Sequence, residues 1–415
     1  MKVILLTDQF IHNKDTFIVG GWIQSLIGVL QASPIIELAV IGQTEENSCI
    51  EKENNTTFYK ICCRKSPNPF SRIYQRFRCK IQDKRVINDY LHAIQNFNPD
   101  IIHIFGTESF LCNIIPLVES KVVVHLQGLI NPYLNAWLPS GISRSLFDFY
   151  SFDLLDSLKG MGSQIRYKHF RKMAQREQNY FNSISYVMGR TTWDKLLAET
   201  LGNNIKYFHQ EEVLRSDFYT ENQWNIKKRE PFQLISVLSP NSYKGFDMIL
   251  KTACLLKSKG IKFQWSICGT SENNSTIKAM EKIFKKKYKS HNVSFRGRKT
   301  AKELVEFLLD SDLFIHPSYI ENSPNSICEA QILGLPVCAT YTGGIPSLVE
   351  DNKTGMLFPA NDPYCLTGII TTLLSDSQKM ANLGNNARKA ALKRHNKETI
   401  LENIENIYQQ ILQSQ

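Results

Sequence analysis

Short apolar runs alternate with stretches of helical hydrophobic spacing from the first residues of the chain onward. In the first half, the apolar runs predict buried strands at residues 2–7, 37–41, 101–105, 121–126, 185–188 and 205–208, with helices between them. Such alternation of strands and helices predicts a parallel sheet that is covered by helices on both faces.

A second series of the same kind begins at Phe232. It predicts a helix over residues 245–259, and strands over 232–238, 264–268, 293–295, 313–315 and 336–340. The stretch before it, Thr220–Pro231, is polar and charged and ends in proline, as domain boundaries often do. We therefore expect an α/β protein with one domain over residues 1–225, a second over 226–395, and a closing helix within 396–415.

The composition is that of an ordinary folded protein. Hydrophobic residues make up 42% of the 415 residues and charged residues 21%, and a chain of this length favours two hydrophobic cores. No apolar run approaches the ~18 residues of a transmembrane helix, and Asp8 interrupts the apolar start far short of a signal peptide. The 10 cysteines are scattered, so we expect a reducing, cytoplasmic setting.

The net charge of +10 indicates an anionic partner, and nucleic acid, anionic lipid headgroups and phosphate-bearing substrates all qualify. Within the first domain, residues 1–225, most of the positive charge lies in residues 60–85 and 159–176. In the first segment Ile73, Phe77 and Ile81 recur at roughly helical spacing, which leaves two interpretations. One is a basic amphipathic helix on an anionic membrane, where each basic residue adds ~1 kcal/mol. The other is a solvated helix that packs its apolar side inward. Nucleic-acid binding is disfavoured because no known reader motif accompanies these segments.

The most informative stretch is His316–Phe358. It predicts a strand, a loop that carries Glu321, and a helix with Ser323-Pro324 as its N-cap and first residue. Glu321 and Glu329 therefore lie near a helix N-terminus at the carboxyl end of a strand, where open α/β sheets bind ligands. Ionised carboxylates only accept hydrogen bonds, so this pair suits a ligand rich in hydroxyls. The alternative is a solvated helix residue and an acid beside the helix cap.

Other candidate residues also lie at strand ends or helix starts. Lys244 stands between a strand and a helix, where a phosphate can meet both its charge and free backbone N–H groups. Gly20 and Gly21 precede an apolar helix, which predicts either N–H groups that meet an anion or a simple tight turn. His125 and Gln127 lie two residues apart at a strand end and therefore share one face.

The stretch from Glu321 to Gly355 resembles the nucleotide-sugar site of the GT4-type retaining glycosyltransferases, the bacterial group 1 glycosyltransferases of the GT-B fold. Their pattern is a glutamate, seven residues, a second glutamate, a G-x-P strand and a Gly-Gly loop. The positions that match it are Glu321, Glu329, Gly334, Pro336, Gly343, Gly344, Pro346, Thr354 and Gly355.

Other segments extend the resemblance, and three positions depart from it. Lys244-Gly245-x-Asp247 resembles the family's K-G-x-D segment, and Gly20-Gly21 resembles its glycine loop beside the donor diphosphate. The departures are Ser239 in place of an arginine, Gln127 in place of a histidine and Ser347 in place of a glutamate.

The resemblance implies two Rossmann-like domains that face a cleft, with the acceptor on the first and the donor on the second. It also implies that the closing helix crosses back onto the first domain. Glu329 would then accept hydrogen bonds from the ribose, while Glu321 and the N–H groups near Asn322 and Ser323 would contact the donor sugar.

The resemblance assigns Lys244 and the Gly20-Gly21 amides to the departing diphosphate, and His125 or Gln127 to the donor sugar. It implies no metal and no cofactor beyond the nucleotide-diphosphate sugar. The leaving phosphate would assist attack from the same face, without a protein nucleophile.

Two more segments, Arg190-Thr-Thr-Trp-Asp194 and Glu212-Val-Leu-Arg215, resemble a sub-branch of bacterial GT4 proteins. Arg190 and Arg215 are expected either to hold phosphate or to tie loops together, and Glu212 can pair with either arginine. Arg190 or Arg298 is a candidate to supply the cation that is missing at Ser239.

We therefore expect a metal-independent retaining glycosyltransferase that acts on a hydroxyl of a glycan or lipid-linked acceptor in surface polysaccharide synthesis. The expected location is the cytoplasm, with peripheral contact at the inner face of the cell membrane. The alternatives are a GT-B epimerase or phosphorylase, and a catalytically weak protein that binds sugar nucleotide or membrane.

Overall fold

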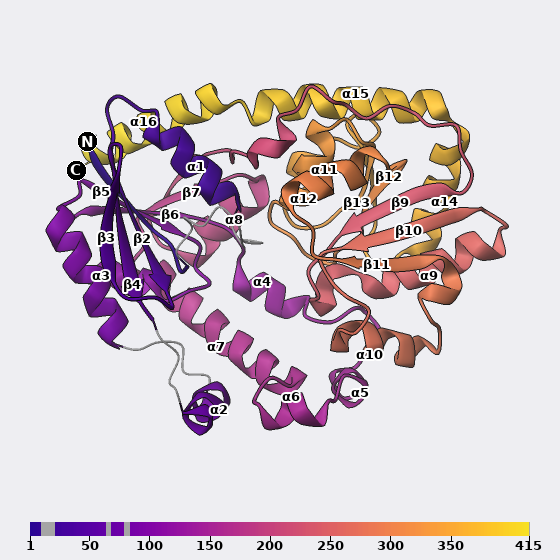
Figure 1. Ribbon diagram of the computed structural model, residues 1–415, viewed down its shortest axis with the longest axis horizontal. Coiled ribbons are helices and arrows are strands. Elements are labelled where there is room, and N and C mark those ends of the chain that lie inside the picture. Colours follow the sequence, from indigo (N-terminus) through magenta and orange to yellow (C-terminus); the bar gives the residue numbers. More distant parts are fainter. Residues whose placement is uncertain (10–20, 64–67, 79–83, 415) are drawn as a thin grey trace. The chain divides into compact units, whose positions relative to one another are not determined.

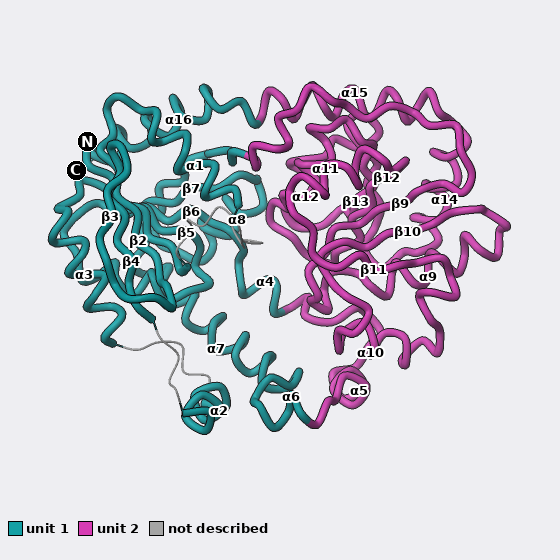
Figure 2. Tube along the Cα trace, viewed as in Figure 1, with its two compact units in different colours: residues 1–134, 155–213, 395–415 teal, residues 135–154, 214–394 magenta. Residues whose placement is uncertain are grey.

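The computed structural model describes residues 1–9, 21–63, 68–78 and 84–414. These residues form two compact units (Figure 2). Unit 1 comprises residues 1–134, 155–213 and 395–415, and unit 2 comprises residues 135–154 and 214–394. This division differs from the predicted boundary at residue 225, and the short segment 135–154 is part of unit 2.

Unit 1 is built on an eight-stranded sheet with the strand order β3-β4-β2-β1-β5-β6-β7-β8 (Figure 1). All neighbours are parallel except β3 and β4. The strands are β1 (Lys2–Leu6), β2 (Glu37–Thr44), β3 (Cys49–Glu53), β4 (Thr56–Cys62), β5 (Ile101–Phe105), β6 (Lys121–His125), β7 (Tyr186–Gly189) and β8 (Lys206–His209). The six predicted strands are confirmed. The β3–β4 hairpin was not predicted, because every residue of β3 is exposed and so carries no apolar pattern.

The helices of unit 1 connect these strands and cover the sheet. They are α1 (Gly21–Gln31), α2 (Pro69–Arg78), α3 (Lys84–Phe97), the 3-10 helix η1 (Leu111–Leu117), α4 (Ile130–Asn135), α6 (Leu154–Leu158), α7 (Ser163–Phe181), α8 (Thr192–Leu201) and α16 (Lys397–Gln413). The closing helix α16 packs in this unit, where the buried Tyr408 hydroxyl lies 2.7 Å from Nδ1 of His103. Ser33 of the same unit donates to Glu405, at 2.5 Å.

Unit 2 is built on a six-stranded parallel sheet with the strand order β11-β10-β9-β12-β13-β14. The strands are β9 (Phe232–Val237), β10 (Phe263–Cys268), β11 (Val293–Gly297), β12 (Leu313–His316), β13 (Val337–Thr340) and β14 (Met356–Phe358). The helices are α5 (Arg144–Tyr150), η2 (Ser216–Phe218), η3 (Ser242–Lys244), α9 (Phe246–Ser258), α10 (Ser275–Phe284), η4 (Lys289–His291), α11 (Ala301–Leu309), α12 (Asn325–Ile332), α13 (Ile345–Leu348), α14 (Pro363–Ser375) and α15 (Ser377–Arg394). The predicted α/β class with parallel sheets is confirmed for both halves of the chain.

The sheet of unit 2 is buried on both faces. Trp265, Phe314 and Phe246 retain no exposed surface, and burial of each such side chain contributes about 1.5–3 kcal/mol. Trp265 satisfies its indole N–H with Ser236 Oγ at 3.1 Å. The resulting core fixes the strand ends from which the candidate ligand-binding residues project.

Helix α12 begins one residue later than predicted. Pro324 occupies the N-cap position in extended conformation, and no side chain caps the helix there. The helix ends at Ile332 with Leu333 as its C-cap, and Gly334 then adopts the left-handed conformation with φ of 80°. Across the described residues, no helix combines the length and apolar character needed to cross a membrane.

Candidate functional site

The residues predicted to bind a ligand fall into both units. In unit 2, Ser239 and Lys244 follow β9, and residues 321–323 follow β12, so both groups lie at the carboxyl edge of adjacent parallel strands. In unit 1, His125 ends β6 and Arg190 follows β7. Gly21 begins α1, and Gly20 lies outside the described residues.

Glu321 is the centre of a charged cluster in unit 2. Its buried carboxylate forms an ion pair with Lys244, and Oε1 lies 3.2 Å from Nε2 of His316 and 3.1 Å from Oγ of Ser318. Burial alone would raise the pKa of Glu321, but the charge of Lys244 and the hydrogen bonds lower it to about 2. The side chain is therefore a fixed anion at neutral pH.

His316 contacts the Glu321 carboxylate through Nε2. Burial lowers the pKa of His316, although the hydrogen bond to Glu321 acts against this. A neutral imidazole that donates to Glu321 must carry its proton on Nε2. The sequence prediction missed His316 and Ser318, whose only signal was their place directly before Glu321.

Two glycines allow the neighbouring loops to approach closely. A Cβ atom at Gly245, which has φ of +77°, would overlap the carbonyl oxygen of Pro317. A Cβ atom at Gly343 would overlap the carbonyl oxygen of Glu321, and the next residue, Gly344, donates its N–H to that oxygen at 2.9 Å. The Gly343-Gly344 loop thus packs against the backbone of Glu321.

The K-G-x-D segment is tied to the loop that carries Glu321. Tyr319 donates its N–H to the carbonyl of Tyr243 at 2.8 Å and its hydroxyl to Oδ2 of Asp247 at 2.9 Å. The fully buried Asp247 also pairs with Lys251, at 2.8 Å. The positions of Lys244 and Glu321 are therefore fixed by shared contacts on both sides.

Glu329 lies in the second turn of α12 and is paired with Arg215. Nε and Nη2 of Arg215 both lie 2.7 Å from Oε1 of Glu329, and the Arg215 guanidinium lies 4.9 Å from the centre of the Phe218 ring. Burial raises the pKa of Glu329, and the positive charge of Arg215 opposes that rise.

The loop that carries Ser239 offers a hydroxyl, which accepts a hydrogen bond from Asn241 at 3.1 Å.

The flanking residues of Glu321 differ in burial. Asn322 is buried, and Ser323 is half-buried at the entrance to α12. Both precede the first turn of the helix, so their backbone groups lie beside a helix N-terminus, which favours anions and hydrogen-bond acceptors.

In unit 1, His125 lies in an aromatic cluster. Its ring stacks on His103 with centroids 5.4 Å apart and meets the edge of Trp22 at 5.3 Å. Burial, together with the charges of nearby groups, lowers the pKa of His125 well below its usual value. Within the described parts of the chain neither ring nitrogen has a hydrogen-bond partner. Gln127 is half-buried, and its amide lies 3.5 Å from the carbonyl oxygen of His125.

Arg190 pairs with Glu212 inside unit 1. The two side chains are 3% and 2% exposed, and Nη2 of Arg190 also lies 3.4 Å from the carbonyl of Leu126. Asp194 completes a capping box with Thr191 and accepts a hydrogen bond from the Tyr207 hydroxyl at 2.7 Å. These contacts favour the interpretation in which Arg190 ties loops together.

Comparison with known proteins places unit 2 in a family. Residues 219–390 match the family model described as glycosyl transferases group 1. This segment belongs to the group 1 glycosyltransferases. The recognition made from Glu321, Glu329 and the K-G-x-D segment is thereby confirmed at family level.

Two bacterial relatives match part of the chain. The chain is 27% identical over 186 residues to the putative colanic acid biosynthesis glycosyltransferase WcaL of Escherichia coli strain K12, which covers 43% of this chain and 45% of WcaL. It is 28% identical over 161 residues to the amylovoran biosynthesis glycosyltransferase AmsK of Erwinia amylovora, covering 36% of this chain and 39% of AmsK. The chain thus spans less than half the length of each of these relatives.

Solved glycosyltransferase structures resemble the whole chain. Sucrose-phosphate synthase of Thermosynechococcus elongatus aligns with a TM-score of 0.71 at 14% identity, over 99% of this chain and 98% of that one. Anabaena Alr3699/HepE in complex with UDP-glucose aligns with a TM-score of 0.65 at 16% identity, over 99% and 100%. These likenesses show the fold, and they confirm the predicted GT-B class.

Two acids of unit 1, the buried Glu177 and the half-buried Glu108, were not predicted as part of any site. Glu177 accepts hydrogen bonds from the backbone N–H groups of Ile130 and Asn131, both at 2.9 Å, and so holds the start of α4. Oε1 of Glu108 accepts from the N–H of Gly128 at 2.7 Å, and burial raises the pKa of Glu108 to about 7. Glu108 follows strand β5, and an acid directly after a buried strand was the signal that could have identified it.

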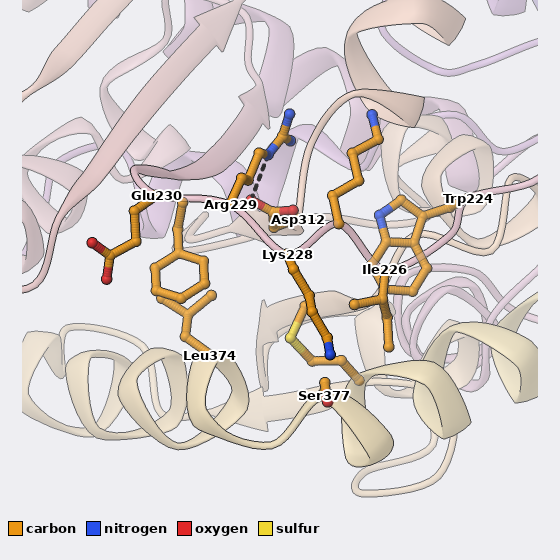
Figure 3. Close-up of a pocket in the computed structure, with 11 residues that line it drawn as sticks. Trp224, Ile226, Lys228, Arg229, Glu230, Asp312, Leu374 and Ser377 are labelled. Carbon is orange, nitrogen blue, oxygen red and sulfur yellow. Dashed lines mark hydrogen bonds and ion pairs between the residues drawn. The ribbon is translucent and has the colours of Figure 1, made fainter.

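Unit 2 also contains a cavity of about 440 Å³ at the opposite, amino end of its strands (Figure 3). Its apolar lining includes Trp224, Ile226, Leu374 and Met380. The Arg229 and Asp312 side chains meet at its rim, at 3.3 Å, as Figure 3 shows. None of the predicted ligand-binding residues lines this cavity.

Proposed function

We propose that this protein is a retaining glycosyltransferase that transfers a sugar from a nucleotide-diphosphate sugar to a hydroxyl of a glycan or lipid-linked acceptor in surface polysaccharide synthesis. The observation that carries the proposal is the fixed cluster of Lys244, Glu321 and His316 at the carboxyl edge of the unit 2 sheet. The names of WcaL and AmsK support a role in polysaccharide synthesis. The UDP-glucose bound to Alr3699/HepE supports a nucleotide-sugar donor.

In this proposal, each charged group has a separate task. Glu329 accepts hydrogen bonds from the ribose, and Glu321 accepts them from hydroxyls of the donor sugar, assisted by the N–H groups near Asn322 and Ser323. The diphosphate draws Lys244 toward it, while His316 and Ser318 keep Glu321 in place. Lys244 then stabilises the charge that develops on the departing diphosphate, which is usually the largest catalytic contribution in such sites.

The cation of Lys244 and backbone N–H groups at the helix start are proposed to neutralise the diphosphate without a resident metal ion or other cofactor. Gly20 and Gly21 are proposed to offer further backbone N–H groups to the diphosphate. Retention follows if the departing phosphate assists the acceptor hydroxyl on the same face of the sugar, so that no protein nucleophile takes part.

A peripheral position on the inner face of an anionic membrane belongs to the same proposal. Helix α2 buries none of its side chains, and its Phe70 and Tyr74 are 78% and 59% exposed. The helix contains three arginines and no acidic residue. Helix α3, in contrast, packs Val86, Tyr90 and Ile94 into the core, so the interpretation as a solvated helix face applies to α3 and the membrane interpretation to α2.

One observation favours a second candidate, a protein that binds sugar nucleotide with weak or absent turnover. The family's arginine is replaced by Ser239, and Arg190, one of the two candidate substitutes, is engaged in a buried pair with Glu212. Donor affinity without turnover would support this candidate over the transferase.

The first test is a thermal shift of the purified protein against UDP-, GDP-, ADP- and dTDP-sugars, with and without EDTA. We expect stabilisation by the sugars of one nucleotide, unaffected by EDTA, because binding to the folded state raises its stability. The variants K244M and E329Q should lose most of this stabilisation. Stabilisation that depends on a divalent cation would contradict the metal-free mechanism, and the absence of any shift would contradict the donor site.

A further inference from the structure

The E-x-L-R segment lies where the chain passes from unit 1 to unit 2, and its two charged residues have different partners. Glu212 pairs with Arg190 in unit 1, whereas Arg215 pairs with Glu329 in unit 2, 114 residues further along the chain. We propose that Arg215 is a positioning residue of the donor site, which holds one oxygen of Glu329 so that the other accepts a hydroxyl of the donor's ribose. This inference rests on the proposed function.

The contact geometry separates the two oxygens of Glu329. Two donors of Arg215 converge on Oε1, each at 2.7 Å, and an ionised carboxylate has about four acceptor positions. Within the described residues, the hydrogen bonds to this carboxylate come from Arg215. The side chain of Glu329 is 6% exposed, so the capacity that remains on Oε2 is available to a ligand at the mouth of α12.

Arg215 is itself held in place. Its guanidinium lies 4.9 Å from the centre of the Phe218 ring, and Phe218 is fully buried. The preceding Leu214 is buried, and its N–H donates to the Tyr219 hydroxyl at 3.1 Å. A rigid planar fork loses little side-chain entropy when it forms hydrogen bonds, so Arg215 can hold Oε1 of Glu329 in place before the ligand arrives.

Arg215 also affects the protonation of Glu329. Burial raises the pKa of this carboxyl and Arg215 opposes that rise, so that removal of the arginine favours the protonated acid. A protonated acid has lost acceptor capacity toward hydroxyl groups. Both effects of Arg215 therefore act on the ribose contact, whereas a purely structural arginine would affect stability alone.

The test compares nucleotides with and without ribose hydroxyls. The dissociation constants of UDP, GDP and ADP, and of their 2′,3′-dideoxy counterparts, are measured by calorimetry for the wild type, R215M, R215K and E329Q. We expect R215M to weaken binding of the preferred ribonucleotide about tenfold, the effect of losing one charge-assisted hydrogen bond. Binding of the dideoxy form should change little. R215K should recover part of the ribose preference.

The matched control is R388M. Arg388 donates to the carbonyl of Ile332 at the end of the same helix α12 and to that of Thr220 at 3.2 Å, and it makes no contact with Glu329. We expect R388M to lower the unfolding temperature while both dissociation constants remain unchanged. This variant separates a loss of helix anchoring from a loss of the ribose contact.

The possible outcomes are distinct. If E329Q loses the ribose preference and R215M keeps it, the positioning role is wrong and the proposed function stands. If R215M weakens the ribose and dideoxy forms equally, Arg215 acts elsewhere and the inference is also overturned. If the wild type binds none of these nucleotides, the proposed function fails, and the inference fails with it.

Discussion

The two units each contain an arginine–glutamate pair of similar chemistry, and the pairs differ in their access to water. In unit 1 the side chains of Arg190 and Glu212 are 3% and 2% exposed. In unit 2 the cations Arg215 and Lys244 keep 28% and 15% of their surface, while their glutamate partners are almost fully buried. The pair in unit 1 is sealed on both sides, whereas those in unit 2 are open on the side of the cation.

This difference indicates how one kind of interaction serves two purposes. A sealed pair cannot exchange partners without exposing an uncompensated charge to the protein interior, so it fixes structure. A half-open pair can exchange its partner for a ligand at smaller cost, because water and ligand reach the cation. The sequence around Arg190 and around Arg215 does not show which pair is sealed. The packing around each arginine in the folded protein decides it.

The largest expected effect is the loss of the sealed pair. R190M removes the guanidinium that pairs with the buried Glu212 carboxylate, which should lower the free energy of unfolding by about 3–5 kcal/mol. The measurement is urea denaturation followed by circular dichroism. R215M is the comparison variant, and it should cost clearly less because Arg215 is partly solvated. Equal losses for both variants would contradict the distinction between sealed and half-open pairs.

The next effect concerns activity at the half-open pair of Lys244 and Glu321. K244M should slow release of the nucleoside diphosphate from the preferred nucleotide sugar by about 10²-fold, because the developing charge on the diphosphate loses its cation. K244M should lower the unfolding temperature less than R190M does, since the Lys244 side chain keeps 15% of its surface whereas that of Arg190 keeps 3%. The control is K251M: Lys251 belongs to the same unit and pairs with Asp247, and it should leave the rate near that of the wild type. A similar loss of rate in K251M would mean that the Lys244 charge affects the rate through the stability of the fold and not through contact with the diphosphate.

Much of this architecture was predictable from the sequence, and the partners of the charged residues were not. The strands follow from short apolar runs, Lys244 and Glu321 follow from their places after strands, and Glu329 follows from its place early in a helix. The pairing of Arg215 with Glu329 joins positions 114 residues apart, so it depends on how the elements of unit 2 pack together. Likewise, the exposed strand β3 carries no apolar alternation, and the packing of Gly343 on Glu321 is a contact between loops that local patterns do not encode.

Two carboxyls should give the units opposite responses to pH. The pKa of Glu108 in unit 1 is raised to about 7, so its folded form binds a proton more tightly than the unfolded chain does. Its contribution to stability should therefore be lost as the pH rises from about 4.5 to 7. The pKa of Glu321 in unit 2 is lowered to about 2, so its contribution is present above pH 4.5 and is lost as the pH falls toward 2.

The measurement is the unfolding free energy between pH 3 and 8 for the wild type, E108Q and E321Q. E108Q should remove the decline between pH 5 and 7, and E321Q should reduce the decline at acid pH. Slopes that remain unchanged in E108Q would mean that Glu108 is ionised at neutral pH and that its buried environment is more polar than the contacts indicate.

The smallest expected effect compares two tyrosines that each donate to a buried aspartate. Tyr207 donates to Asp194 in unit 1 at 2.7 Å, and Tyr319 donates to Asp247 in unit 2 at 2.9 Å. Both aspartates keep other partners, so Y207F and Y319F should each lower the unfolding free energy by only about 1 kcal/mol. Y207F should leave nucleotide-sugar affinity unchanged, because Asp194 lies beside the sealed pair of Arg190 and Glu212.

Y319F should in addition weaken nucleotide-sugar binding severalfold, because Tyr319 ties the K-G-x-D segment to the loop that carries Glu321. Isothermal calorimetry with the nucleotide sugar that gives the largest thermal shift measures this difference directly. If the two variants lose the same affinity, or neither loses any, the loop of Glu321 is held by its backbone contacts with Tyr243 and Gly344 alone. Nucleotide-sugar affinity would then depend on the half-open pairs of Arg215 and Lys244, and the Tyr319 hydroxyl would make no contribution to it.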